Sequence, residues 1–354
     1  MVTDQRKDTN GEKECWLELL RIIAIVGVIF NHTDGFYLYY SNTDSKVTFF
    51  YSVLASVFCR MAVPLFLMVS GSVLLRKKES LEELYKKRIF RIVCVLFFTS
   101  AFYYILQIMR GRRTEYSLID FARGLLAGNI QESLWYLYLY LGILLLLPVL
   151  RKLVIGLNRQ EYKYFILLQC VFSVLLPVIE SLTGLAVRSE LYLFNLYLFY
   201  FLSGYWWSNE KKEADQNVYH REEKWCISFF LAAWIINIGI ILEQHYVTGV
   251  YDQSLLDLMI PVMAQSFFVW IKSAEGIHPS SRKKRDIILR IGGCTFGIYL
   301  LEQLVRIQLL PMYLKLCMIV PGAVACSIYT AGTFSVALCY TMCLKKVRII
   351  REFI

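Results

Sequence analysis

Residues 134–150 read LWYLYLYLGILLLLPVL, a run of 17 residues without a single charged side chain. A helix needs roughly 17–25 predominantly apolar residues to cross the hydrocarbon layer of a bilayer. Four aromatic residues open the run, Trp135, Tyr136, Tyr138 and Tyr140, and such rings are typical of packing contacts and of the membrane–water interface. The run therefore predicts a membrane-spanning helix.

The rest of the 354-residue chain follows the same pattern, with 57% of residues in the apolar set and 19% charged. Soluble domains hold about 45–50% apolar and about 25% charged residues, so the excess excludes a soluble two-domain enzyme, a disordered chain and a secreted disulfide scaffold. We expect an all-α, multi-pass protein embedded in the lipid bilayer. Ten apolar runs predict about ten spans, at 15–37, 48–75, 89–109, 134–150, 162–183, 191–208, 225–247, 254–272, 291–310 and 318–343.

The distribution of Lys and Arg predicts the orientation, because cytoplasmic loops carry an excess of these residues. With both termini inside, 28 of the 38 Lys and Arg fall in cytoplasmic segments and 7 in the opposite segments. The sequence thus predicts cytoplasmic tails at 1–14 and 346–354 around a transmembrane domain at 15–345. The formal charge of +10 reflects topology and anionic-lipid contacts, so we expect no nucleic-acid partner.

The ten cysteines lie mostly singly in apolar runs, without a CxxC motif or a histidine at ligand spacing. They are typical of small packing residues, and we expect no metal site.

Charged residues inside spans indicate function, because each Arg near a helix centre costs about 2.5–3.5 kcal/mol on insertion scales. Arg21 and His32 lie in the first run at a spacing that returns them to within roughly 20° of one helical face, about 16 Å apart. One face of this helix would thus carry a cation near one end and an imidazole near the other, as expected for a helix that lines a cleft through the membrane. The alternative is that Arg21 reaches lipid headgroups while His32 caps the helix.

Two other runs carry unusual residues. Pro64 frees a backbone carbonyl near Arg60, which predicts a broken helix that lines a cavity, with a purely structural kink as the alternative. Glu302 and Arg306, at i and i+4, are predicted to neutralise each other, with a purely structural pair as the alternative.

Arg88 and Arg91 open the third run on one helical face, directly after Lys86 and Lys87. Four cations at a helix entrance suit phosphate groups, and anionic lipid is an equal alternative.

Together these residues resemble the acyltransferase-3 family of integral-membrane O-acyltransferases, in order from about residue 15 to 345. The resemblance rests on the combined order and spacing of motifs that are individually weak. They are Arg21-x10-His32, Arg60…Val63-Pro64-Leu65-Phe66…Ser70-Gly71, Arg88-x2-Arg91, Leu134-Trp135-Tyr136-Leu137…Pro148, Tyr200-Phe201-Leu202-Ser203-Gly204-Tyr205 and Phe296-Gly297-Ile298-Tyr299-Leu300.

The resemblance implies transfer of an acyl group, usually acetyl, from cytoplasmic acyl-CoA to a hydroxyl of a cell-surface glycan or its lipid-linked precursor. It also implies a bacterial plasma-membrane protein in which Arg21 and His32 are essential. Glu302 stands where many relatives carry histidine, and the glutamate that one branch carries in its Trp-containing motif is absent. Both departures place the chain nearer the standalone small-acceptor or polysaccharide branch. The acceptor and the oligomeric state stay open.

We expect His32 and Arg21 to be catalytic. Neutral imidazole suits a general base that takes the acceptor proton while the oxygen attacks the thioester, and an acyl-histidine intermediate is an alternative route. Arg21, Arg60 and Arg306 would stabilise the oxyanion. The expected acyl-CoA-binding residues are Arg88, Arg91, Lys87 and Arg60, and the expected substrate-cleft residues are Ser70, Trp135, Glu302 and Arg306.

A transporter or exporter of a polysaccharide or small solute is the main rival, because buried charges also serve substrate and proton paths. The chain shows no inverted repeat and few embedded acids beyond Glu302, which disfavours it. A non-enzymatic membrane subunit is a third option and predicts tolerance of substitutions at His32. Acetyl transfer from acetyl-CoA without any gradient would separate these options.

Overall fold

The computed structural model describes residues 14–33, 35, 45–113, 117–185, 195–209, 216–249, 257–273 and 282–354. These segments are helices joined by short connections, and no strand occurs among them, which confirms the all-α class.

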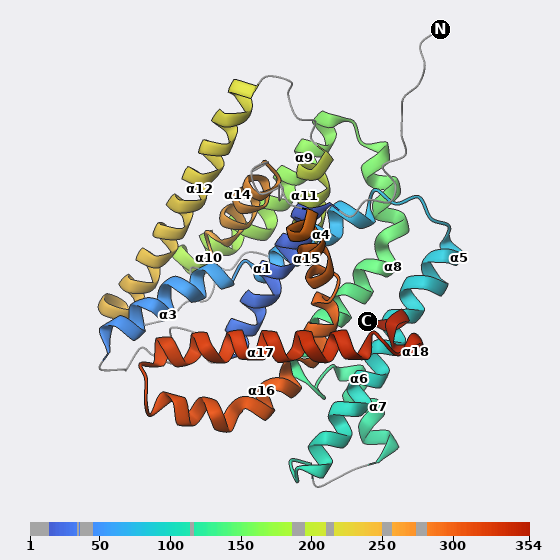
Figure 1. Ribbon diagram of the computed structural model, residues 1–354. Coiled ribbons are helices and arrows are strands. Elements are labelled where there is room, and N and C mark those ends of the chain that lie inside the picture. The colour runs from blue at the N-terminus through green and yellow to red at the C-terminus, as the bar shows by residue number, and fades with distance from the viewer. Residues whose placement is uncertain are drawn as a thin grey trace.

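Helices occupy each of the ten apolar runs (Figure 1). The longer elements are α1 (Cys15–His32), α3 (Lys46–Cys59), α4 (Ala62–Leu74), α6 (Phe90–Met109), α8 (Trp135–Gly156), α9 (Arg159–Cys170), α11 (Leu196–Asn209), α12 (Gln216–Glu243), α14 (Ile260–Ser273), α16 (Thr295–Cys317) and α17 (Gly322–Leu344). The shorter elements are α5 (Leu81–Leu84), η1 (Tyr85–Ile89), α7 (Leu118–Ala127), η2 (Glu132–Leu134), η3 (Val171–Leu175), α10 (Leu176–Thr183), η5 (Gln244–Thr248), α15 (Arg282–Gly292) and α18 (Arg348–Phe353).

Six helical segments of the described chain are long and apolar enough to cross a membrane, and the bent pair α15–α16, with an angle of 58°, makes up to seven. The helices in the runs 162–183, 191–208 and 254–272 are not among them. The structure thus supports a polytopic membrane protein, while the count of ten spans and the orientation of the termini stay predictions. The six segments are Cys15–His32, Lys46–Leu74, Leu81–Met109, Glu132–Gly156, Lys224–Val247 and Gly322–Leu344.

Helix α1 lies at the centre of the molecule (Figure 1) and contacts α3, α4, α14, α15, α16 and α17. Its residues Leu20, Ile25 and Ile29 are completely buried. Gly27 permits a close approach, since a Cβ at this position would lie 3.1 Å from the Cβ of Ala62. The helix that carries Arg21 and His32 is therefore surrounded by protein.

Helices α4 and α11 cross with their backbones in contact. A Cβ on Gly71 would clash with the carbonyl of Phe201, and a Cβ on Gly204 would clash with the backbone of Met68. Small residues allow such close packing between membrane helices. The Ser-Gly motifs of these two runs thus have a packing function.

The second span breaks where Pro64 predicts it. Helix α3 ends at Cys59, and α4 starts at Ala62. Pro64 occupies the first turn of α4, where its missing N–H costs no helical hydrogen bond. Arg60 is the residue at the break.

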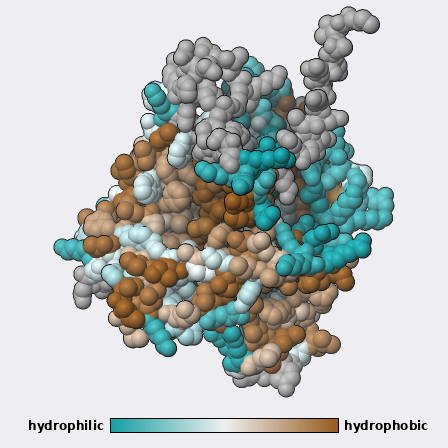
Figure 2. Space-filling view, in the orientation of Figure 1, coloured by the Kyte–Doolittle hydropathy of each residue, from teal (hydrophilic) through white to brown (hydrophobic). Residues whose placement is uncertain are grey.

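Large apolar side chains face outward along the bundle, as in Phe98 (66% exposed), Val149 (65%) and Ile235 (64%). Figure 2 shows hydrophilic residues gathered on one side, over α5 and the end of the chain at α18. The exposed cations Lys77, Lys78, Lys86 and Lys87 flank α5 in the sequence. An apolar belt beside a basic polar face is typical of a membrane protein.

Candidate functional site

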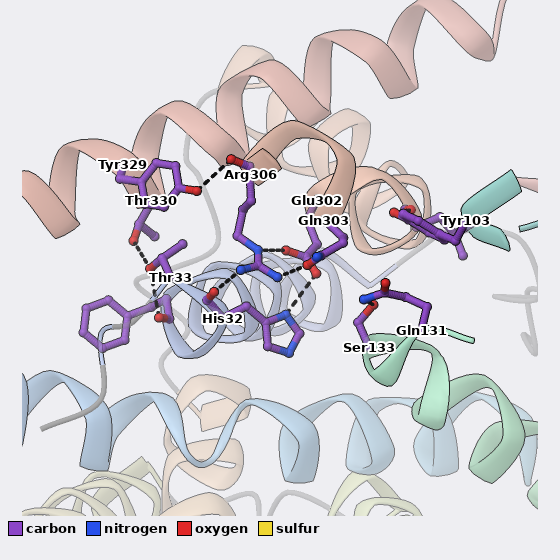
Figure 3. A network of polar contacts seen from close by, with 12 residues as sticks. His32, Thr33, Tyr103, Gln131, Ser133, Glu302, Gln303, Arg306, Tyr329 and Thr330 are labelled. Carbon is purple, nitrogen blue, oxygen red and sulfur yellow. Dashed lines mark hydrogen bonds and ion pairs between the residues drawn. The ribbon is translucent and has the colours of Figure 1, made fainter. Parts of the chain in front are cut away.

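His32 and Glu302 form a hydrogen-bonded pair between two central helices. His32 is the last residue of α1, and Glu302 lies within α16. The Nδ1 atom of His32 is 2.9 Å from the Oε1 atom of Glu302 (Figure 3). Glu302 is fully buried, whereas the His32 side chain is 28% exposed. The carboxylate is therefore enclosed by protein, while part of the imidazole stays accessible.

Arg306 holds the other oxygen of the same carboxylate. Its Nε atom donates to Oε2 of Glu302 at 2.8 Å, one helical turn away, so the predicted pair is present. The guanidinium also donates to the backbone carbonyl of His32 and to the side chain of Gln303. A buried carboxylate is costly unless it is paired and hydrogen-bonded, and Glu302 is both. Arg306 thus links the two helices and keeps Glu302 in place.

Helix α17 supports this network from a second side. The hydroxyl of Tyr329 donates to the backbone carbonyl of Arg306 at 2.8 Å. The hydroxyls of Thr33 and Thr330 lie 3.2 Å apart and connect the end of α1 to α17. Three helices therefore fix the position of the imidazole (Figure 3).

The segment that leads into α8 lies against the same stretch of α16. The hydroxyl of Tyr299 donates to the carbonyl of Ser133, and the amide of Gln131 donates to the hydroxyl of Ser133 at 3.3 Å. Tyr103 of α6 donates to the carbonyl of Leu300 at 3.0 Å. The network thus extends from α1 through α16 to the start of α8 (Figure 3).

This geometry suits general-base chemistry. When imidazole is neutral, a carboxylate at Nδ1 favours the tautomer with a proton on Nδ1 and leaves Nε2 as the acceptor. The same carboxylate stabilises the imidazolium that forms when Nε2 takes a proton. Glu302 therefore fits as the residue that orients His32.

Arg21 is fixed towards the other end of α1. Its guanidinium is 2.6 Å from Oε1 of Glu18, whose side chain is 3% exposed. Among the described residues, Oε2 of Glu18 has no hydrogen-bond partner. A rise of 1.5 Å per residue places Arg21 about 16 Å from His32 along α1. Arg21 and His32 therefore serve different parts of any ligand that spans the two.

The four cations at the entrance of the third run separate into two kinds. Lys86 and Lys87 are exposed and pair with Glu82 and Glu83 at 2.6 and 2.8 Å. Ion pairs between such exposed side chains contribute little to the stability of the folded protein. Arg88 is 24% exposed and contacts a different acid.

Glu79 lies between Arg88 and Arg151. Arg88 donates to it at 2.9 Å, and Arg151 donates at 2.9 Å and also to the carbonyl of Leu74. Burial raises the pKa of the Glu79 carboxyl, but the hydrogen bonds and charges of Arg151 and Arg88 outweigh burial and hold its pKa below the ordinary value. Burial and the neighbouring charge of Arg88 lower the pKa of Lys77. The region is a dense cluster of cations around one carboxylate.

Arg91 belongs to the same region but has separate partners. Its Nε atom donates to the carbonyl of Phe353 at 3.2 Å, and its guanidinium lies 5.6 Å from the ring centroid of Phe296. Aromatic faces stabilise a guanidinium at this range. Arg91 therefore connects the start of α6 to α16 and to the end of the chain.

Three tyrosines connect these cations to the His32 network. Tyr140 lies close enough to Arg88, Arg91 and Arg21 to interact electrostatically. Its ring stacks on Tyr136 with centroids 6.2 Å apart, and the ring of Tyr136 lies 5.9 Å from that of Tyr299. Tyr299 precedes Glu302 by one turn of α16. An aromatic column therefore extends from the arginines to the catalytic candidates.

Ser70 adjoins this column, because its side chain lies near the hydroxyl of Tyr136. Trp135 lies at its edge: its ring contacts Tyr136 with centroids 6.2 Å apart, and its side chain is 39% exposed. Both residues therefore lie beside the aromatic column.

Arg60 has a different environment from the other cations that were expected to bind the donor. It forms an ion pair with Asp257, and its own side chain is 10% exposed. Arg88, by contrast, pairs with Glu79. Asp257 lies inside an apolar run, and its charge there was a signal in the sequence that our interpretation did not use. Glu18 and Arg151 were likewise not singled out.

A comparison with protein families gives an independent result. An acyltransferase domain model matches residues 15–342, nearly the whole chain. The chain belongs to the acyltransferase-3 family. No curated protein and no solved structure matches it. The family establishes a membrane acyltransferase in general terms, so an acyl donor and an acceptor are required.

The acyltransferase shows no group of three or more His, Cys, Asp or Glu able to hold a metal within the described segments. None of the ten cysteines, which all lie in described segments, forms a disulfide.

Proposed function

We propose that this acyltransferase moves an acetyl group from cytoplasmic acetyl-CoA to a hydroxyl of a cell-surface glycan or of its lipid-linked precursor. The observation that carries the proposal is the contact of His32 with the buried Glu302, whose second oxygen is held by Arg306. The family match over residues 15–342 supports the reaction class.

His32 acts as the general base. Its Nε2 atom takes the proton of the acceptor hydroxyl while the oxygen attacks the thioester carbonyl carbon. The C–S bond then breaks, and the imidazolium returns the proton to the departing CoA sulfur. Proton transfer by a positioned group typically accelerates such a step by about 10²–10⁴-fold. Glu302 keeps the imidazole oriented throughout and stabilises its charged form.

The acyl-CoA donor binds through the cations at the opposite end of the aromatic column. Arg88 and Arg91 bind the phosphates, with Lys87 as an exposed contributor. The pantetheine arm then passes Tyr140 and Tyr136 towards His32. Arg21 interacts electrostatically with both tyrosines. About 16 Å of helix α1 separates it from His32, where the thioester carbonyl reacts. Arg21 therefore acts on the donor arm and not on the thioester carbonyl.

An acyl-histidine intermediate would use the same atoms differently, because Nε2 itself would attack the thioester. Glu302 supports this route equally well, since it would stabilise the cationic acyl-imidazole. Intact-protein mass after incubation with acetyl-CoA alone distinguishes the routes. A stable gain of one acetyl group that disappears in His32→Ala indicates the covalent route, and no gain indicates direct transfer.

The decisive experiment measures acetyl transfer by purified protein without any ion gradient. Radiolabelled acetyl-CoA is the donor, and membranes of source cells that lack the gene supply the acceptor. Wild-type protein should label a saccharide fraction, and His32→Ala should lose this activity while still inserting into membranes. The variant His245→Ala is the control, because it removes a half-buried imidazole of η5 that packs against the ring of Phe49, outside the His32–Glu302 pair. Near-normal transfer by His32→Ala would refute the assignment, and absence of transfer by the wild type would favour a transporter.

A further inference from the structure

Arg60 and Asp257 form a second charged pair within the bundle, away from the donor cations. The Arg60 side chain is 10% exposed and the Asp257 side chain 44% exposed. Of the atoms in the described residues, the Nε atom of Arg60 is buried without a hydrogen-bond partner. A buried guanidinium with an unused donor can bind an additional oxygen ligand.

Two aromatic rings lie next to this pair. Tyr197 of α11 interacts electrostatically with Asp257, and its ring centroid is 5.6 Å from that of Trp135. Trp135 is 39% exposed at the start of α8. Helices α8 and α11, the break after α3 and the segment before α14 therefore bring together two partly accessible rings, a guanidinium and a carboxylate.

The cluster borders His32 on one side through the backbone. The side-chain amide of Asn31 donates to the carbonyl of Cys59 at 3.1 Å, so the residue before His32 is bonded to the residue before Arg60. The Oδ1 atom of Asn31 is buried and has no partner among the residues that the structure describes. The Oδ1 atom of Asn31, a hydrogen-bond acceptor, and the Nε atom of Arg60, a donor, thus lie on either side of the hydrogen bond between Asn31 and Cys59.

The cluster also borders the His32 network on a second side. Ser133, two residues before Trp135, accepts a hydrogen bond from Tyr299. Tyr299 lies one turn before Glu302 on α16. The chain next to Arg60 and the chain next to Trp135 are thus bonded to the segments that carry His32 and Glu302, whereas Arg88 and Arg91 lie at the other end of the aromatic column.

We propose that Trp135, Tyr197, Arg60 and Asp257 form the acceptor subsite and bind a sugar ring beside His32. This inference rests on the proposed function and assigns Arg60 to the acceptor rather than to acyl-CoA. Aromatic faces pack against the apolar face of a sugar, while a carboxylate and a guanidinium accept from and donate to its hydroxyls. A phosphate-rich donor would be repelled by Asp257, which favours a hydroxylated ligand here.

A purely structural role of the Arg60–Asp257 pair makes a different prediction. A structural ion pair across the break between α3 and α4 should tolerate exchange of its two charges. A binding subsite should not, because the carboxylate and guanidinium would then meet the wrong sugar hydroxyls. The double variant Arg60→Asp with Asp257→Arg therefore separates the two roles.

The test combines two measurements on full-length protein. Transfer of radiolabel from acetyl-CoA is measured with gene-deficient source membranes as the acceptor, and the Kd for acetyl-CoA is measured on purified protein. Trp135→Ala and Asp257→Asn should each lower transfer by at least about tenfold, as expected for loss of contacts to a bound ligand. The Kd for acetyl-CoA should stay within about twofold of wild type, which also shows that the variants fold. Trp225→Ala and Asp286→Asn change exposed residues elsewhere and are the matched controls.

Each outcome decides the proposal. Selective loss of transfer, with no rescue by the charge exchange, supports the subsite. Wild-type transfer in both single variants, an equal loss of donor affinity, or rescue by the charge exchange would overturn it. A wild-type protein that labels no saccharide would remove the proposed function itself, and that result depends on no variant.

Discussion

Glu302 and His32 lie 270 positions apart in the chain, yet their side-chain atoms are 2.9 Å apart in the structure. The carboxylate is completely buried and is shared with Arg306, so its orientation is fixed on both oxygens. This relationship is the basis for the proposed role of His32 as an oriented general base.

Glu302→Gln should therefore reduce kcat strongly. The amide preserves the shape of the side chain but removes the charge that stabilises imidazolium, and it no longer selects one histidine tautomer. In a comparable catalytic triad the equivalent change costs about 10⁴-fold, so we expect a loss of about 10²–10⁴-fold. The KM for acetyl-CoA should change little, because the donor cations are distant. Steady-state kinetics measures both constants.

Glu243→Gln, an exposed acid at the end of α12, is the control for this experiment and should behave like wild type. If Glu302→Gln retains more than about a tenth of the wild-type kcat, Glu302 does not orient the base.

The double variant Arg88→Ala with Arg91→Ala should weaken acetyl-CoA binding by at least about tenfold, because it removes two charged contacts to phosphate. Lys86→Ala should have a smaller effect, since Lys86 is exposed and already paired with Glu82. Calorimetric titration of purified protein gives the Kd directly. Arg112→Ala, an exposed cation beyond α6, is the control. A selective effect on the acceptor instead of the donor would remove this assignment.

Glu79 should make stability depend on pH. Its pKa is lowered in the folded state, so its ionised form stabilises the protein above the unfolded value near 4.3, and this contribution is lost as the pH falls through the lower folded value. At pH 7, Glu79→Gln should unfold about 2–4 °C below wild type, because Arg88 and Arg151 lose their shared partner. The difference should shrink below about pH 4.

Thermal unfolding in detergent across this pH range measures the effect. The exposed Glu352→Gln variant at the end of the chain should show no comparable pH dependence. A constant gap between wild type and Glu79→Gln at all pH values would contradict the proposed linkage.

Gly71→Ala and Gly204→Ala should abolish correct folding. In each variant the new methyl group would collide with the backbone of the facing helix, which no side-chain rearrangement relieves. Gly142→Ala and Gly239→Ala are matched controls, because a Cβ at either position has no neighbour within 4 Å. The yield of monodisperse protein after detergent extraction measures the outcome. Normal yield for Gly71→Ala would show that α4 and α11 do not pack as described.

Local patterns in the sequence predicted much of the architecture. Long uncharged runs predicted helices, because a helix satisfies all its backbone hydrogen bonds within the membrane. Pro64 predicted the break beside Arg60, and the i,i+4 spacing predicted the contact between Glu302 and Arg306. The break and the Glu302–Arg306 contact each depend on residues within about one helical turn of each other. The count of ten spans and the cytoplasmic termini stay predictions.

Local patterns also identified most of the candidate site residues, but they did not predict which residues these would contact. The chain alone determined that Arg21 and His32 lie on one helix and that Arg88 and Arg91 open another. Only the packing of helices decided that His32 meets Glu302, that Arg88 shares Glu79 with Arg151, and that Arg60 meets Asp257. Helical periodicity defines which face of a helix is polar, but the relative rotation and depth of two helices depend on close contacts such as those at Gly27, Gly71 and Gly204.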